Sequence, residues 1–98
     1  MKQITLICAA GMSTSMLVER MKQAANQKGI EVEIRAIANS EFKKYADQTD
    51  ILLLGPQISY MFDEFKSQYE PKGIKVNVIN SVDYGMMNGE KVLLEAIA

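Results

Sequence analysis

The stretch that decides the fold is Ile4-Thr5-Leu6-Ile7-Cys8-Ala9-Ala10-Gly11-Met12-Ser13-Thr14-Ser15, close to the start of a chain of 98 residues. Its first four residues are apolar or β-branched and predict a short buried strand. Small residues follow, and over residues 14–28 apolar side chains recur at helical spacing until Gly29, a residue type that commonly ends helices. A buried strand that leads through a loop of small residues into a helix is typical of a parallel β-α-β unit.

The rest of the chain repeats this alternation of strands and helices. Further strands are predicted at residues 32–37, 51–54 and 74–79. The pattern predicts an α/β three-layer sandwich, in which a four-stranded parallel sheet of the flavodoxin-like order 2-1-3-4 has helices on both faces. No linker, repeat or low-complexity segment interrupts it, so residues 1–98 are interpreted as a single domain.

Helical segments are predicted after each of the later strands. Asn39 or Ser40 is expected to cap a short helix. The next helix is expected to stop at Pro71-Lys72-Gly73, and its inward residues are Ile58, Met61, Phe62, Phe65 and Tyr69. A loop is expected over residues 80–88, before a last helix over residues 89–97.

Composition excludes several classes of function. The net charge of −1 provides no general attraction for nucleic acid, and the longest apolar runs are far shorter than the ~20 residues of a membrane span. A single cysteine cannot form an intrachain disulfide, and no signal peptide is recognised, so a cytoplasmic protein is expected. The chain contains no histidine, which excludes catalytic triads and Cys-His pairs, and no cofactor or metal is expected.

The loop after the first strand is the candidate site. In parallel sheets, ligands bind beyond the carboxyl ends of the strands, where the strand order reverses. Small residues let backbone N–H groups turn toward an anion, and the helix that follows directs its positive end at the same place. These features predict a phosphate-binding loop, whose residues are Ala9, Ala10, Gly11, Met12, Ser13, Thr14 and Ser15.

Cys8 stands at the start of this loop and is the candidate nucleophile. A helix N-terminus stabilises a thiolate and lowers the pKa of a nearby thiol. The same N–H groups would then hold a phosphoryl group on the sulfur. A lone cysteine at the end of a buried strand is also commonly a small core residue, and Ser13, Thr14 and Ser15 are also interpreted as helix caps.

Four runs together resemble one family over essentially the whole chain. They are Cys8-Ala9-Ala10-Gly11-Met12-Ser13-Thr14-Ser15, Leu54-Gly55-Pro56-Gln57 with Tyr60-Met61, Pro71-Lys72-Gly73-Ile74, and Asp83-Tyr84-Gly85-Met86-Met87-Asn88-Gly89. In order and spacing they resemble the IIB component of the lactose/cellobiose (chitobiose) class of the bacterial phosphoenolpyruvate-dependent sugar phosphotransferase system.

The resemblance implies a phosphocysteine carrier. Cys8 would accept a phosphoryl group from a phosphohistidine of the IIA protein and transfer it to a sugar imported through the membrane protein IIC. The resemblance implies that the sugar is cellobiose, chitobiose or a related disaccharide. The lack of a fused membrane domain in this chain suits the cellobiose branch of the family better than the lactose branch. We expect a monomer that visits the inner face of the membrane transiently and neither binds nucleic acid nor inserts into the bilayer.

Two alternatives from other classes of protein remain. The family loop is also similar to that of low-molecular-weight tyrosine phosphatases, which have Cys-x5-Arg, but the position of that arginine is occupied by Thr14. The loss of an arginine fork favours a carrier over a hydrolase. A non-catalytic phosphate- or flavin-binding module is the other alternative, although four strands leave little room for a flavin ring.

Two further positions are candidates for contact with phosphate or a partner. Gln57 follows the third strand at the same sheet edge as Cys8, and it is also explained as a polar residue at a helix start. Tyr84 lies in the run 83–89 after the fourth strand, which we expect to form part of a docking face, and it is interpreted either as an anchor or as a core ring. As plain structure, this run is expected to be a turn in which Gly85 and Gly89 supply backbone freedom.

Overall fold

The sheet has the predicted order and direction. The computed structural model describes residues 1–8 and 11–98, and for Cys8, Gly11, Met12 and Ser13 it describes the backbone only. The strands are β1 (Lys2–Cys8), β2 (Val32–Ala38), β3 (Ile51–Leu54) and β4 (Lys75–Val78). All neighbours pair in parallel in the order β2-β1-β3-β4, so the prediction of a 2-1-3-4 sheet is confirmed.

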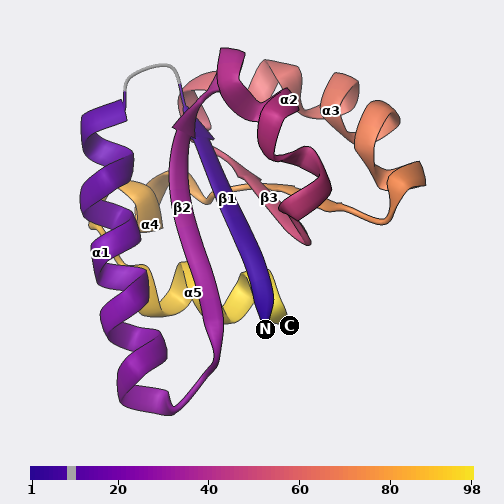
Figure 1. The fold of residues 1–98 in the computed structure, drawn as a ribbon. Helices are drawn as coiled ribbons and strands as arrows, with labels where there is room; N and C mark the ends of the chain where they lie inside the picture. The colour runs from indigo at the N-terminus through magenta and orange to yellow at the C-terminus, as the bar shows by residue number, and fades with distance from the viewer. Residues whose placement is uncertain (9–10) are drawn as a thin grey trace.

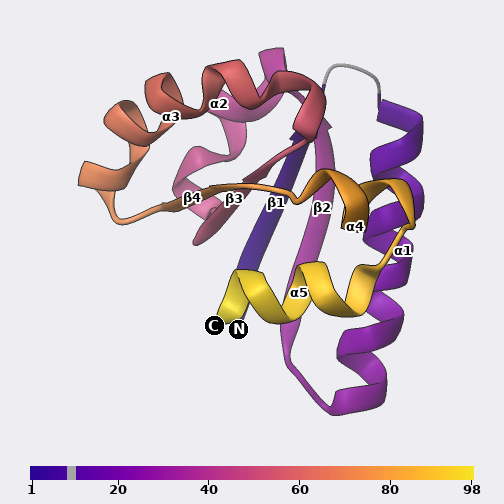
Figure 2. The same ribbon diagram turned by 180° about the vertical axis from the view of Figure 1, so that it is seen from behind.

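Helices cover both faces of this sheet (Figures 1 and 2). The α-helices are α1 (Gly11–Lys28), α2 (Phe42–Tyr45), α3 (Phe62–Tyr69), α4 (Ser81–Gly85) and α5 (Gly89–Ile97). Short 3₁₀ turns stand before or after them at Asn39–Glu41, Ala46–Gln48, Pro56–Met61 and Glu70–Lys72. Helices α1, α4 and α5 lie on one side of the sheet and α2 and α3 on the other, which gives the expected three layers.

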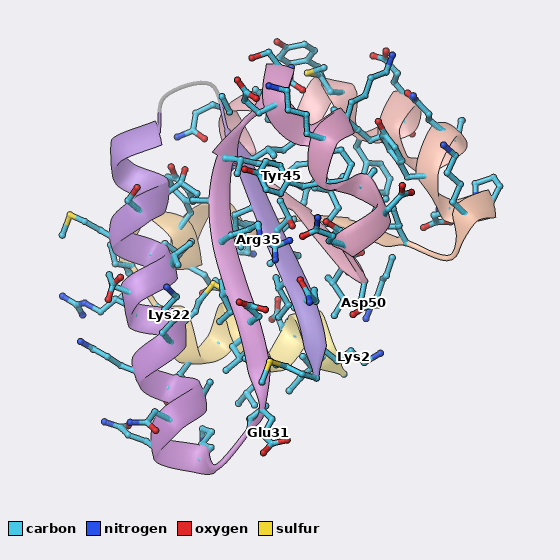
Figure 3. The ribbon with its side chains drawn as sticks, viewed as in Figure 1. Lys2, Lys22, Glu31, Arg35, Tyr45 and Asp50 are labelled. Carbon is cyan, nitrogen blue, oxygen red and sulfur yellow. The ribbon has the colours of Figure 1, made fainter. Side chains whose placement is uncertain are left out.

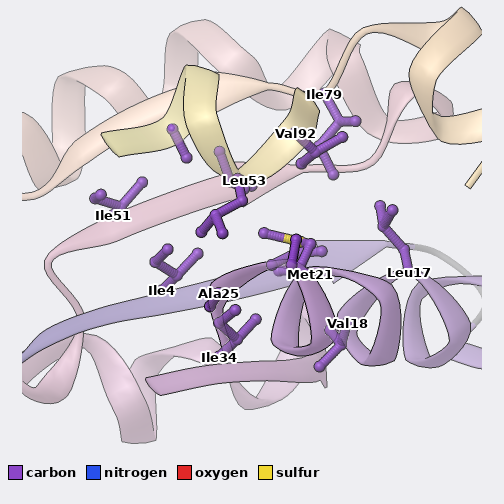
Figure 4. Close-up of a cluster of buried hydrophobic side chains, with 14 of the residues drawn as sticks. Ile4, Leu17, Val18, Met21, Ala25, Ile34, Ile51, Leu53, Ile79 and Val92 are labelled. Atoms are coloured by element: carbon purple, nitrogen blue, oxygen red, sulfur yellow. The ribbon is translucent and has the colours of Figure 1, made fainter. Parts of the chain in front are cut away.

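The alternation of side chains along the strands divides the apolar interior into two clusters. Ile4 and Leu6 of β1 face α1 and α5, whereas Ile7 faces α2 and α3. The first cluster packs strand side chains against α1 and α5, with Leu17, Met21 and Val92 among its members (Figure 4). The second is built around Phe42, Phe65 and Tyr69, whose rings contact one another with centroids 4.9 to 6.2 Å apart. Each face of the sheet is therefore covered by its own layer of helices.

Three local predictions are wrong. Helix α1 begins at Gly11 rather than near residue 14, and a five-residue helix, α4, occupies part of the predicted loop 80–88. Neither Asn39 nor Ser40 caps α2, which follows Glu41 without a side-chain cap. The Asn39 amide instead donates to Met61 Sδ at 3.5 Å, a contact between segments that only the folded sheet brings together.

Other boundaries follow the predicted stop signals. Gly29 and Gly73 adopt positive φ angles of 69° and 91°, which glycine tolerates without strain, and the segments before them end there. The carboxyl ends of the strands lie at one edge, opposite the two chain termini (Figure 1). Within the described part of the chain, no helix combines the length and apolar character needed to cross a membrane.

Candidate functional site

Cys8 ends the central strand at the carboxyl edge of the sheet. It pairs in register with Ala38, the last residue of β2. On the other side, the N–H of Gly55 donates to the carbonyl of Ile7 at 2.8 Å, which holds the segment after β3 against the end of β1. The Cys8 backbone therefore lies between the ends of two neighbouring strands, at the place where parallel sheets bind ligands.

Helix α1 starts only three residues after Cys8. Of the predicted phosphate-binding loop, Ala9 and Ala10 lie outside the described residues, and Gly11, Met12 and Ser13 form the beginning of α1. The first N–H groups of this 18-residue helix have no partners within the helix and carry its positive partial charge. Because α1 already begins at Gly11, the interpretation of Ser13, Thr14 and Ser15 as its N-caps is wrong.

The two hydroxyl residues whose side chains are described have different environments. Thr14 is 1% exposed, and its Oγ1 lies 3.4 Å from the hydroxyl of Tyr84, which is 7% exposed. Ser15 is exposed on the surface of α1. The contact between Thr14 and Tyr84 joins the start of α1 to α4, across 70 residues of sequence. Sequence reasoning missed this pair because no local pattern links the two residues.

Helix α4 is held in place by a side-chain N-cap and by an ion pair with α5. The Asn80 side chain accepts hydrogen bonds from the N–H groups of Val82 and Asp83 at 2.9 and 3.2 Å, which makes it the N-cap. Asp83 is buried, and its Oδ1 lies 3.4 Å from Nζ of Lys91 in α5. Its Oδ2 has no hydrogen-bond partner among the described residues. An asparagine directly before a short helix is a recognisable cap signal, so this feature could have been found in the sequence.

The run at residues 83–89 differs from the turn that was expected. Neither Gly85 nor Gly89 has a positive φ angle, so the expectation that they supply backbone freedom is wrong. Met87 takes that role, with φ of 54°. Gly89 is glycine for another reason: a Cβ there would lie 2.4 Å from the backbone carbon of Arg20 in α1.

Gln57 lies beside the end of β1 but is turned to solvent. It belongs to the 3₁₀ segment Pro56–Met61, directly after the Gly55 contact with Ile7, and its side chain is exposed. Tyr60 in the same segment is 80% exposed, and Val82 in α4 is 63% exposed. Apolar side chains therefore stand exposed on two of the segments that follow strand ends.

Neither arginine of the chain is at the candidate site. Arg20 is exposed on α1, nine residues or about 13 Å beyond its start. Arg35 is paired in register with Thr5, well before the strand end, where its guanidinium donates to Gln3 Oε1 at 2.5 Å and lies 5.6 Å from the ring centre of Tyr45 (Figure 3). The described residues include no cluster of carboxylates or other ligands suited to a metal ion.

Residues 3–95 match the family described as "PTS system, Lactose/Cellobiose specific IIB subunit". Two curated relatives from Lactococcus lactis, a galactose-specific and a cellobiose-specific EIIB component, are each 44% identical to this chain and cover 97% of it and 93% of their own length. The solution structure of the cellobiose-specific IIB component from Borrelia burgdorferi is 46% identical, with a TM-score of 0.79, and the alignment covers 98% of this chain and 88% of that one.

A more distant likeness concerns the fold alone. A mutant of YwlE from Bacillus subtilis, a low-molecular-weight phosphatase-like protein, aligns with a TM-score of 0.63 over 95% of this chain and 94% of its own, at 14% identity. The phosphatase-like architecture that the sequence predicted is therefore confirmed.

Proposed function

The chain belongs to the lactose/cellobiose-specific IIB family of the sugar phosphotransferase system, and from this premise we propose that Cys8 is its phosphoryl carrier. EIIB components act as phosphotransferases in sugar transport. The observation that carries the proposal is the position of Cys8 at the end of the central strand, three residues before the start of α1. The positive end of a helix suits both a thiolate and a phosphoryl group attached to it.

The reaction consists of two transfers. In the first, the Cys8 thiolate attacks the phosphorus of a phosphohistidine on IIA; an S–P bond forms, the P–N bond breaks, and its electron pair returns to the imidazole. In the second, a sugar hydroxyl oxygen attacks the same phosphorus at IIC; an O–P bond forms, the S–P bond breaks, the thiolate leaves, and the hydroxyl proton passes to solvent. The residues 9–15 are proposed to surround the phosphoryl group between these steps.

The placement of the arginines supports a carrier rather than a phosphatase. A cysteine phosphatase clamps the transferring group with an arginine fork, and here Thr14 holds that position in the sequence. Arg20 is exposed further along α1, and Arg35 donates a hydrogen bond to Gln3. Without that clamp, attack by water on the phosphocysteine is expected to be slow, which a carrier requires.

The sugar is proposed to be cellobiose, chitobiose or a related disaccharide. Relatives named for cellobiose and for galactose are equally identical to this chain, so the proposal rests on the family class rather than on one relative. We propose that the exposed Tyr60 and Val82, with Gln57, contribute to the surface that meets IIA and IIC in turn. Small transient interfaces are typical of such exchanges.

The test is phosphorus NMR after incubation with the phosphorylated IIA protein. The wild-type protein is expected to give a thiophosphate resonance that is absent from Cys8→Ser, with circular dichroism confirming that the variant is folded. Wild-type labelling of the serine variant would exclude Cys8 as the carrier. Steady release of inorganic phosphate from p-nitrophenyl phosphate would instead identify a phosphatase. Adding a IIC preparation and a panel of disaccharides then identifies the sugar that removes the label.

A further inference from the structure

Two buried hydroxyl groups meet where α1 begins. Thr14 Oγ1 and the Tyr84 hydroxyl are 3.4 Å apart, and both side chains are more than nine-tenths buried. This separation is longer than the ~2.8 Å of a typical O–H···O bond. Contacts at sites of chemistry are often long in the free protein and shorten in the complex. The hydroxyl contact is therefore weak in the free protein. It lies on the first turn of α1, which is proposed to bind the phosphoryl group.

Tyr84 belongs to α4, and several contacts hold this helix in place. Asn80 caps α4 through two N–H groups, and the N–H of Asn88 donates to the carbonyl of Asp83 at 2.9 Å. The Asp83 carboxylate also lies 3.4 Å from Lys91 of α5. The ring of Tyr84 belongs to the apolar cluster between the sheet, α1 and α5. Its hydroxyl is thus held at a defined point next to Thr14.

We propose that Tyr84 is a positioning residue for the phosphoryl-binding turn, a role that rests on the proposed function of Cys8. Its hydroxyl fixes Thr14, and Thr14 fixes the first turn of α1, whose N–H groups stabilise the thiolate and the phosphocysteine. Because Tyr84 is buried, it acts through Thr14 rather than through contact with a partner protein.

Tyr84→Phe removes one oxygen atom and leaves the ring in the core. The first turn of α1 is expected to become less well ordered, so that the thiolate of Cys8 is less stabilised. Phosphorylation of Cys8 by phosphorylated IIA should slow by about threefold to tenfold, the effect that loss of one neutral hydrogen bond supports. The pH at which Cys8 reacts half-maximally with iodoacetamide should rise, and this second measurement requires no partner protein.

Tyr69→Phe is the matched control. Tyr69 is 3% exposed and packs with Phe42 and Phe65 on the other face of the sheet, so its hydroxyl is remote from α1. This variant should keep the wild-type transfer rate and alkylation profile. In a Thr14→Val background, Tyr84→Phe should have no additional effect, since the two hydroxyl groups act as a pair.

The outcomes separate this inference from the proposed function. If folded Tyr84→Phe matches the wild type in both measurements, or if its effect persists unchanged in the Thr14→Val background, the positioning role is wrong. If the wild-type protein is not phosphorylated at all, the proposed function fails. The iodoacetamide profile still tests the influence of Tyr84 on Cys8 in that case, and an unshifted profile would overturn the inference.

Discussion

Gly89→Ala is expected to weaken the fold strongly, because α1 and α5 touch at this residue. A Cβ atom at Gly89 would lie 2.4 Å from the carbonyl carbon of Arg20, 2.5 Å from the N of Met21 and 2.6 Å from Cβ of Arg20. Two of these three atoms are backbone, so no side-chain rotation can relieve the overlap. Accommodating the methyl group requires α5 to move away from α1, which opens the apolar cluster between them.

The magnitude follows from the cost of overpacking. Forcing an extra methyl group into a tightly packed contact costs about 3 kcal/mol, a large share of the ~5–15 kcal/mol that stabilises a typical domain. Alanine's higher helix propensity offsets little of this, because Gly89 is the first residue of α5. For a domain of this size, about 3 kcal/mol corresponds to a fall in Tm of roughly 12–24 °C, measurable by calorimetry or by circular dichroism melts.

Gly85→Ala is the matched control for this prediction. A Cβ at Gly85 would meet no atom within 4 Å, and Gly85 has no positive φ angle. This variant should therefore be unchanged or up to about 1 kcal/mol more stable, as alanine reduces the freedom of the unfolded chain. If Gly89→Ala melts within a few degrees of wild type, the close approach of the two helices is not a determinant of stability and the reasoning fails.

Two further predictions concern a helix cap and a buried phenol. Asn80→Ala should lower the free energy of unfolding by about 1 kcal/mol in urea titrations, since two N–H groups of α4 lose their acceptor. Asn80→Asp keeps a carboxylate acceptor there and should retain most of the wild-type stability. Equal losses of stability in both variants would argue against capping. Burial raises the pKa of Tyr69 above its ordinary value of 10.0, so the unfolded chain loses this proton first and stability should fall as the pH rises beyond that value. Urea titrations at about pH 8 and about pH 11 should show a smaller fall for Tyr69→Phe than for wild type, and parallel falls would contradict the prediction.

Much of the architecture could be predicted because it depends on local patterns. The apolar run Ile51–Leu54, followed by Gly55 and Pro56, predicts a buried strand, and α5 spans the residues that its periodicity indicates. The handedness of parallel crossovers restricted the topology, the flavodoxin-like order 2-1-3-4 was favoured among the arrangements left, and the placement of Cys8 followed from that order. The absence of histidine and of a loop arginine is likewise a property of the sequence alone.

The errors arose where distant segments decide the local conformation. Asn39 looked like a cap, but folding places Met61 beside it, and its amide turns there instead. The run at residues 80–88 looked like a loop because five residues are too few to give a helical period. The Asn80 cap is a local signal that could have indicated the helix, whereas the burial of Tyr84 in the core depends on the distant layers. A side chain that could cap a helix can also hydrogen-bond to other groups that the fold brings near it. The sequence does not show which of these contacts is the more favourable.

The sequence by itself determined that this chain forms a parallel sheet with its single cysteine at the end of the central strand. Tertiary structure alone decided that Gly89 must be glycine because α1 crosses it, and that Tyr84 reaches Thr14 from 70 residues away. The physical reason is the range of the interactions. Periodicity and turn chemistry act over a few residues, whereas close packing and buried hydroxyl pairs exist only after the layers have assembled.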